Sequence, residues 1–214
     1  MGSDPLFDTL FRPTTQPAQA ASAAPVRATG TRSRAGNAMN RTRAALLDGA
    51  RQAVEKSGTK ITMAQVASAG GVAKATLYNH FRTRDAVLSA LLAAEVTRLV
   101  DAAAGRPLTE ALASTATSLS GHPLLRALAR LEPATLTALG RVNPAADGWR
   151  EARDAVRIAV ADAGRGGADL VLRWIASHVV TPSDPEAIAA DVEVLIAGLP
   201  AAPAARSGQQ AESA

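Results

Sequence analysis

The residues best suited to chemistry lie between Thr62 and Phe81, in the sequence TMAQVASAGGVAKATLYNHF. Lys74, Thr76, Tyr78 and Asn79 fall within eight residues of one another. A lysine can donate to guanine O6 and N7 or to phosphate, and an asparagine can read a base edge. Threonine and tyrosine hydroxyls suit phosphate, and a threonine methyl or tyrosine ring can touch a thymine methyl. These side chains predict contact with DNA.

Two short helices joined by a turn must position these side chains. The first is predicted over Met63–Ala69, with Thr62 supplying the N-cap oxygen. Gly70-Gly71 then allows a turn, because glycine adopts positive φ at low cost. Val72 is expected to be a buried wedge before a second helix over Ala73 to about His80. This is the helix-turn-helix pattern, whose second helix enters a major groove.

The segments around this motif also read as helices. Residues 40–57 carry an amphipathic apolar pattern, and Gly58 is placed to end that helix. A long helix is predicted over about Asp85 to Ala103, with Asp85 favourable at its start. Core candidates in the small domain share apolar character and helical spacing: Leu46, Leu47, Ala50, Ala53, Val54, Ile61, Val66, Val72, Leu77 and Phe81.

The remainder of the chain is also expected to be helical, giving an all-α fold. Apolar content is 47% but aromatic content is only 3%, which favours packing of small residues between helices over a sheet. Helices are predicted over about residues 108–120, 124–131, 133–139, 149–163, 168–180 and 185–199. Residues 1–39 are predicted to be a disordered basic arm and residues 200–214 a disordered tail, because both are rich in Ala, Pro, Ser and Gln.

The segment GGVAKATLYNHFRTRDAVLSALL resembles the signature of the tetracycline-repressor (TetR) family of bacterial regulators. It shows a glycine-valine turn, a Thr-Leu-Tyr triplet, a His-Phe pair, a basic-acidic step and an apolar helix in the family's order. The resemblance covers about residues 41–100. Ala73 departs from it by replacing a common serine or threonine cap, and Ala75 stands where glycine is frequent.

The resemblance implies an organisation in two domains. A three-helix DNA-binding domain over residues 40–84 would be joined by the long fourth helix to a helical ligand-binding and dimerisation domain over residues 85–199. His80 and Arg84 match family positions that meet phosphate. Together with the chemistry above, the predicted DNA-binding residues are Arg43, Thr62, Lys74, Ala75, Thr76, Tyr78, Asn79, His80 and Arg84. The alternative is that the Tyr78 side chain is partly buried in the core and that His80 caps a helix end.

Charge is distributed unevenly along the chain. Residues 1–103 carry 13 Lys and Arg against 7 acids, whereas residues 104–214 carry 10 against 12. A cationic half that contains the helix-turn-helix favours a polyanionic partner, although ordinary solubilising charge is an open alternative. The basic arm could reach into a minor groove or remain a solvated tail.

The resemblance also implies a sensor body and a homodimer. Candidate ligand contacts are the large or polar side chains His122, Arg126, Trp149, Arg153 and Trp174, each of which could instead be structural. The last two helices would pair with their symmetry mates through Val171, Ile175, Val179, Ile188, Val192, Leu195 and Leu199. The alternative is that these apolar stripes are core within one chain.

Enzyme chemistry lacks its parts in this sequence. There is no cysteine, the three histidines have no metal-ligand spacing, and no G-x-S-x-G occurs. Gly164–Gly167 lacks the Lys-Ser/Thr of a phosphate-binding loop. Asp191 and Glu193 are two apart and would lie on different helix faces. We expect no catalytic residue, no cofactor and no metal.

No apolar run of about 18 residues and no secretory signal are evident, so we expect no membrane segment and a bacterial cytoplasmic location. The leading hypothesis is a homodimeric repressor that leaves a palindromic operator when a small molecule binds. The alternatives are an activator or ligand-independent regulator of the same fold, or a helical ligand- or protein-binding module with a vestigial DNA-binding head.

Overall fold

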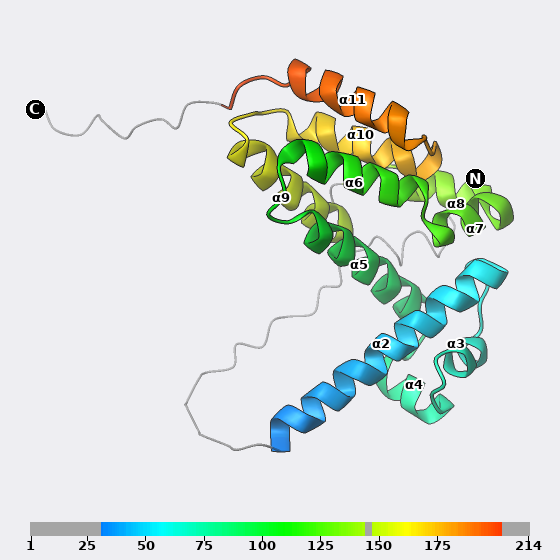
Figure 1. The fold of residues 1–214 in the computed structure, drawn as a ribbon. Helices are drawn as coiled ribbons and strands as arrows, with labels where there is room; N and C mark the ends of the chain where they lie inside the picture. Colours follow the sequence, from blue (N-terminus) through cyan, green and yellow to red (C-terminus); the bar gives the residue numbers. More distant parts are fainter. Residues whose placement is uncertain (1–30, 144–146, 203–214) are drawn as a thin grey trace, which may run out of the picture.

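The computed structural model describes residues 31–143 and 147–202, and within them it contains helices and no strand. The predicted all-α class is therefore confirmed. Figure 1 shows the elements, which are α2 (Thr31–Ser57), α3 (Met63–Ala69), α4 (Lys74–His80), α5 (Arg84–Ala103), α6 (Leu108–Ser120), α7 (Pro123–Leu131), α8 (Pro133–Leu139), α9 (Asp147–Asp162), α10 (Ala168–Val180) and α11 (Pro185–Gly198).

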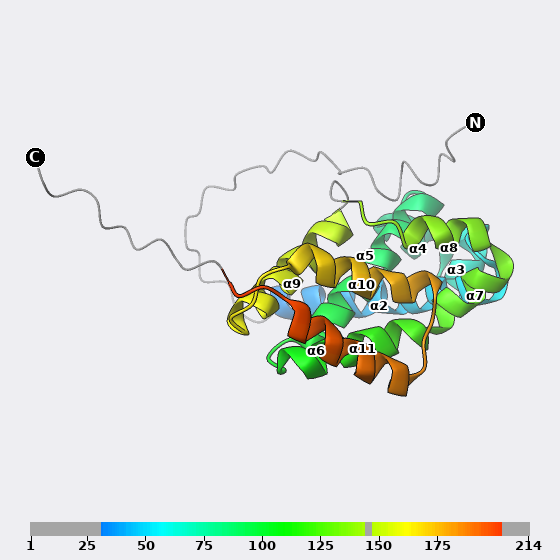
Figure 2. The ribbon, with the colours of Figure 1, turned by 90° about the horizontal axis from the view of Figure 1, so that it is seen from above.

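The helices form a small head and a larger body. Helices α2, α3 and α4 make the head, and α5 runs from the head into the body (Figure 1). In the body, α6 packs against both α10 and α11, and α10 also packs against α9 (Figure 2). Helices α7 and α8 lie over the C-terminal end of α2, so part of the body rests directly on the head.

Helix α2 is longer than the sequence predicted. It begins at Thr31, nine residues before the expected start at Asn40, so the prediction of disorder was wrong for residues 31–39. The added segment, TRSRAGNAM, contains no proline and is rich in arginine and alanine, which favour helix. The predicted arm over residues 1–30 lies outside the described residues.

One core cluster holds the head together. Its largest buried side chains, including Leu46, Val66 and Leu77, are fully inaccessible to solvent. The same cluster continues into Leu124 and Leu128 of α7 and also includes Leu136 of α8, which belong to the body in sequence order. The predicted wedge Val72 is half-buried against this cluster. The core of the head is therefore completed by α7 and α8.

Two glycines allow α2 and α3 to approach closely. A Cβ atom on Gly49 would lie 2.7 Å from the Val66 carbonyl oxygen and would overlap the Gly70 amide nitrogen. A Cβ on Gly70 would lie 2.8 Å from the Ala45 carbonyl oxygen. Gly71, at φ +63°, supplies the predicted left-handed residue of the turn before α4.

The body has a second core cluster, which changes the interpretation of the last two helices. Val171, Ile188, Val192 and Leu199 are at most 3% exposed, and they pack with α6 and α9 side chains such as Val160. The prediction that these four form a dimer interface was wrong, because α10 and α11 turn them toward the interior of their own chain. Ile175, Val179 and Leu195, the other three predicted interface residues, are half-buried.

The four described residues after α11, 199–202, run back along the α9–α10 turn. The Pro200 carbonyl accepts a hydrogen bond from Gly166 N at 2.7 Å, and Ala202 N donates to the Gly164 carbonyl at 3.0 Å. Disorder from residue 200 was therefore wrong for residues 200–202, which pair with the α9–α10 turn. Residues 203–214 lie outside the described part. Within residues 31–143 and 147–202, no helix combines the length and apolar character needed to cross a membrane.

Candidate nucleic-acid interface and interdomain cleft

Helix α3 is fixed at its start by a reciprocal pair of hydrogen bonds. The Thr62 hydroxyl oxygen accepts from Gln65 N at 3.2 Å, and Gln65 Oε1 accepts from Thr62 N at 2.7 Å. This capping box confirms the predicted N-cap and satisfies two amides that the helix leaves unpaired. The Thr62 hydroxyl also donates to Gln65 Oε1 at 2.9 Å, so its first role is to hold α3.

Helix α4 presents a polar face to solvent. Lys74, Ala75, Tyr78 and Asn79 are exposed, and their spacing of i, i+1, i+4 and i+5 places them on one side of the helix. Leu77 on the opposite side is fully buried and anchors the helix in the head core. Tyr78 is 50% exposed, so its ring presents half of its surface to a partner. Thr76 and His80 flank this face and are half-buried.

Helix α4 lacks a side-chain cap. Ala73 occupies the N-cap position with extended backbone, and no side chain bonds to the first-turn amides, as the sequence predicted. Three of the helix's seven residues, among them Lys74 and Tyr78, are exposed polar groups. Its attachment therefore depends on Leu77 and on the chain that continues through Phe81, which is 4% exposed.

Two arginines flank α4, and each already has a partner. The Arg43 guanidinium of α2 lies 4.8 Å from the centre of the Phe81 ring, a cation–π contact at the end of α4. Arg84 pairs with Asp85 at 3.0 Å in the first turn of α5. The N-cap of α5 is Thr83, which accepts from Ala86 N at 3.1 Å, so the capping role expected of Asp85 was wrong.

Eight of the nine predicted DNA-binding residues therefore lie on the head, and the ninth, Arg84, begins α5. Five of them share the exposed or flanking positions of α4 with Lys74. Whether each of them contacts DNA stays a prediction. These residues could be predicted from the sequence because a recognition helix is a local feature. Its spacing and its turn are contained within twenty residues.

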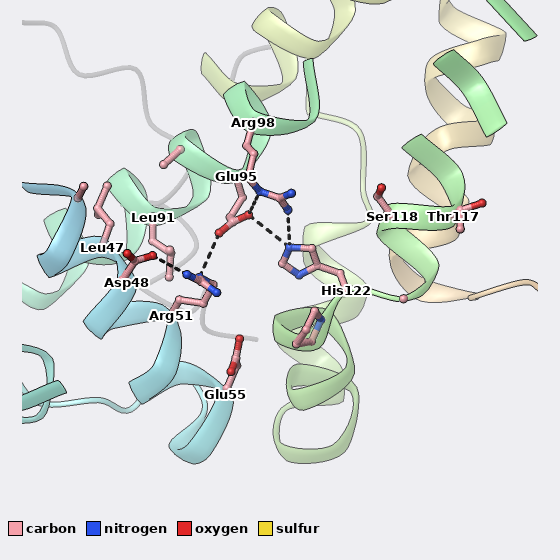
Figure 3. Close-up of a pocket in the computed structure, with 14 residues that line it drawn as sticks. Leu47, Asp48, Arg51, Glu55, Leu91, Glu95, Arg98, Thr117, Ser118 and His122 are labelled. Carbon is pink, nitrogen blue, oxygen red and sulfur yellow. Dashed lines mark hydrogen bonds and ion pairs between the residues drawn. The ribbon is translucent and has the colours of Figure 1, made fainter. Parts of the chain in front are cut away.

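A cleft of about 630 Å³ separates the head from the body. One wall is α2 and the opposite walls are α5 and the α6–α7 junction, as Figure 3 shows. Its apolar lining includes Leu47 and Leu91, and polar side chains contribute from all of its walls. The charged and imidazole side chains at the cleft are Asp48, Arg51, Glu55, Glu95, Arg98 and His122.

Glu95 of α5 lies at the centre of a group of charged and imidazole side chains at the cleft. His122 Nε2 lies 3.3 Å from Glu95 Oε2, Arg98 Nε lies 2.9 Å from the same oxygen, and Arg51 Nε approaches Oε1 at 3.7 Å. The hydrogen bond with His122, followed by that with Arg98, lowers the pKa of Glu95 from 4.5 to about 2, although burial opposes this shift. The carboxylate is therefore an anion at neutral pH.

His122 is buried with incompletely satisfied nitrogens. Its Nε2 is within reach of both the Glu95 carboxylate and Arg98 Nη2, at 3.3 and 3.1 Å, and the neutral ring can serve only one of them at a time. Its Nδ1 is buried and has no hydrogen-bond partner among the described residues. Figure 3 shows the ring between the α6–α7 junction and the Glu95–Arg98 pair, so the network crosses from the body toward α2.

The structure does not bring the five predicted ligand residues together. Only His122 lines the large cleft, while Trp149 and Arg153 line a separate cavity of about 100 Å³. Arg126 and Trp174 line neither, and Trp174 packs edge-on against the His178 ring at 4.6 Å. Sequence reasoning missed Arg51, Glu95 and Arg98. The sequence signal that could have identified Glu95 and Arg98 was their spacing of i, i+3 beside the apolar face of α5.

The geometry defines a helix-turn-helix DNA-binding head on an all-helical body. Residues 46–91 match the family model described as bacterial regulatory proteins, tetR family. The N-terminal part of the chain therefore carries the domain that this family model describes, which supports a DNA-binding regulator. The family resemblance of the sequence is thereby confirmed.

A solved structure with a TM-score above 0.5 shares the fold, and two others superpose less closely. Salmonella enterica GusR superposes with a TM-score of 0.52 at 20% identity, covering 73% of this chain and 94% of that chain. The fatty acid degradation regulator FadR from Bacillus halodurans gives 0.46 at 17% identity, covering 73% and 95%. A gamma-butyrolactone receptor described as an ArpA-like protein gives 0.46 at 23% identity, covering 78% and 92%. No curated protein matches the chain significantly.

Proposed function

We propose that the protein is a homodimeric repressor that binds a palindromic operator through α4 of each subunit and is released by a small molecule. The observation that carries the DNA-binding part is the exposed face of α4. Lys74, Tyr78 and Asn79 point away from the head there, while Leu77 fixes the helix from behind. A helix with small and polar residues outward and one anchor inward suits a major groove.

The proposed dimer uses the outer face of the last two helices. Leu170 and Val180 of α10 are 51% and 39% exposed, and Val194 of α11 is 75% exposed. The half-buried Ile175 and Leu195 pack against the body core and Val179 packs against the head core, so these three lie on the inner side and are not part of this face. Apolar side chains on two adjacent helices favour burial against a second copy, and a two-fold axis makes the contact self-complementary. The two α4 helices would then read half-sites about 34 Å apart.

For the effector, we propose the cleft between α2 and α5 as its site. Its volume of about 630 Å³ lies within the range of small-molecule sites. A molecule bound there would touch Leu47 and Arg51 of the head together with Leu91 and His122 of the body, so occupancy could change how the two are held. Coupling is reciprocal, so an effector that weakens operator binding is itself bound more weakly in the presence of operator.

A substitution in the cleft distinguishes this proposal from the alternatives of the same fold, which are a ligand-independent regulator and an activator. Ala94 lines the cleft and is half-buried, so Ala94→Trp would fill the cleft from the α5 side. The variant should keep operator binding and lose the response to the effector. A response equal to that of wild type would place the effector elsewhere.

The proposal is tested by selecting operators from a random duplex library with the purified protein, in parallel with Lys74→Ala/Tyr78→Ala. Wild type should enrich an inverted repeat, and the double variant should enrich nothing while remaining a folded dimer. Arg106→Ala is a matched control, because it removes an exposed cation beyond the far end of α5. Enrichment of the same sequence by the double variant would reject α4 as the reading helix, and enrichment of no sequence by wild type would favour a vestigial head. Repeating the binding with a metabolite panel then identifies the effector.

A further inference from the structure

One carboxylate of the body, that of Glu132, is hydrogen-bonded to the head just before the helix-turn-helix. Glu132 lies between α7 and α8 and forms both the C-cap of α7 and the N-cap position of α8. Its Oε1 accepts from Thr59 N at 2.8 Å, and its Oε2 accepts from the Thr59 hydroxyl at 2.6 Å. Thr135 donates to Oε2 at 3.1 Å from the body side. Thr59 is 7% exposed, so this contact is shielded from water.

The backbone before Thr59 is shaped to receive this carboxylate. Gly58 ends α2 at φ +69°, a conformation that glycine adopts without the strain of a side chain. A Cβ on Gly58 would also overlap Glu132 Oε1 and lie 2.9 Å from its Cδ. The positive φ favours glycine here, and a larger residue would also displace the Glu132 carboxylate from Thr59.

Helix α7 is held against α2 at both ends and along its length. At its N-terminal end, His122 bonds to Glu95, which approaches Arg51 of α2 at 3.7 Å. At its C-terminal end, Glu132 bonds to Thr59. Between them, Leu124 and Leu128 are buried in the core cluster of the head. A displacement of α7 would therefore act directly on α2 and on the segment after it.

Thr59 stands three residues before Thr62, the N-cap of α3, and the intervening Ile61 is 2% exposed in the head core. Helix α3 packs against both α2 and α4. We propose that Glu132 is a positioning residue, through which the body sets the placement of α3 and α4 and thus the affinity for operator. This inference rests on the proposed DNA binding of α4 and adds to it the residue by which the body controls the head.

The proposal is tested by a double-mutant cycle in the full-length protein, with Glu132→Ala, Thr59→Val and the combined variant. Operator affinity is measured by fluorescence anisotropy at a temperature where circular dichroism shows every variant fully folded. Glu132→Ala should weaken binding at least tenfold, and Thr59→Val, which keeps the bond from its backbone N–H, should weaken it less. The combined variant should be little worse than Glu132→Ala, because that change already removes both bonds to Thr59. Glu132→Gln, which keeps an acceptor for Thr59 N, should recover part of the loss. Glu186→Ala, an exposed acid in the first turn of α11, is the matched control and should bind as wild type does.

Hydrogen exchange without DNA provides a readout that is independent of the proposed function. Glu132→Ala should accelerate exchange of the Leu77 and Phe81 amides in and after α4, while amides of α6 keep wild-type rates. Wild-type operator affinity in Glu132→Ala, or additive losses in the combined variant, would overturn the inference. If wild type binds no operator, the proposed function fails, and unchanged exchange in α4 would then overturn the positioning role separately.

Discussion

The head and the outer pair of helices, α10 and α11, differ in the side chains that they expose to solvent. In the head, apolar residues such as Leu77 point inward, and the outward face of α4 is polar. In the outer pair, Val171 and Val192 point inward, yet Val194 and Leu170 remain exposed on the other side. The head is complete once α7 and α8 cover it. The outer pair still presents an apolar surface, which is the physical basis for expecting a second copy there.

The difference shows that an apolar pattern indicates burial but not the partner that provides it. Val192 and Val194 are two residues apart on α11, and the first is 0% exposed whereas the second is 75% exposed. Both are valines, so residue type alone does not distinguish the core position from the surface position. The polar face of α4 is more informative. Polar side chains on the exposed side of a helix whose opposite side is buried indicate a polar partner.

The largest expected effect comes from placing a charge at each of these two valines. Val192→Asp puts a carboxylate into the body core and should cost about 3 kcal/mol or more of folding free energy. Val194→Asp should leave the melting temperature of the monomer almost unchanged and convert the dimer to monomer. Circular dichroism melting and sedimentation velocity measure the two effects. A Val194→Asp protein that remains dimeric would move the interface away from this face.

A smaller effect is expected where the head is packed backbone to backbone. Gly49→Ala should destabilise the protein by about 1–3 kcal/mol, because the added Cβ meets the backbone at Gly70 and Val66. Gly148→Ala in α9 is the matched control, since a Cβ there would make an ordinary 3.7 Å contact with Val96. Chemical denaturation measures both. Equal stabilities for the two variants would contradict the tight contact between α2 and α3.

The junction between head and body should respond to acid. Because the pKa of Glu95 is about 2 in the folded protein and 4.5 ordinarily, the unfolded chain binds more protons as pH falls between these values. The stability contributed by Glu95 is thus present above pH 4.5 and lost as pH falls toward 2. Glu95→Gln should flatten this part of the stability–pH curve, measured by urea unfolding. A variant with the same slope as wild type would show that Glu95 is not held by His122 and Arg98.

Much of the fold could be predicted from sequence because its signals are local. Thr62 as a cap, the turn at Gly71 and the buried Leu77 all follow from residue type and spacing within one segment. Two helix starts after α5 agree with the prediction, since Pro133 and Pro185 begin helices where proline fits the first turn. Helix α7 begins at Pro123, one residue before the predicted start. The start of α2 at Thr31 was missed, because its composition resembled the tail before it.

The contacts between head and body could not be predicted, because they join residues far apart in sequence. Glu132 and Thr59 are separated by 73 positions, and neither stands in a motif that indicates the other. The same is true of His122 and Glu95, which meet where the α6–α7 junction lies beside α5. The cleft depends on that placement as well, so four of the five ligand residues proposed from residue type lie outside it.

The central claim, that the outward face of α4 reads DNA, is tested most directly by the operator affinity of Lys74→Ala as a function of salt. If Lys74 contacts a base edge, the variant should lose about 1–3 kcal/mol of binding free energy for its selected operator and relax its preference at one position. If Lys74 contacts phosphate, all sequences should weaken together and the salt slope should fall by about 1. Arg106→Ala should change neither quantity. Affinity and salt slope for Lys74→Ala equal to those of Arg106→Ala would contradict the account.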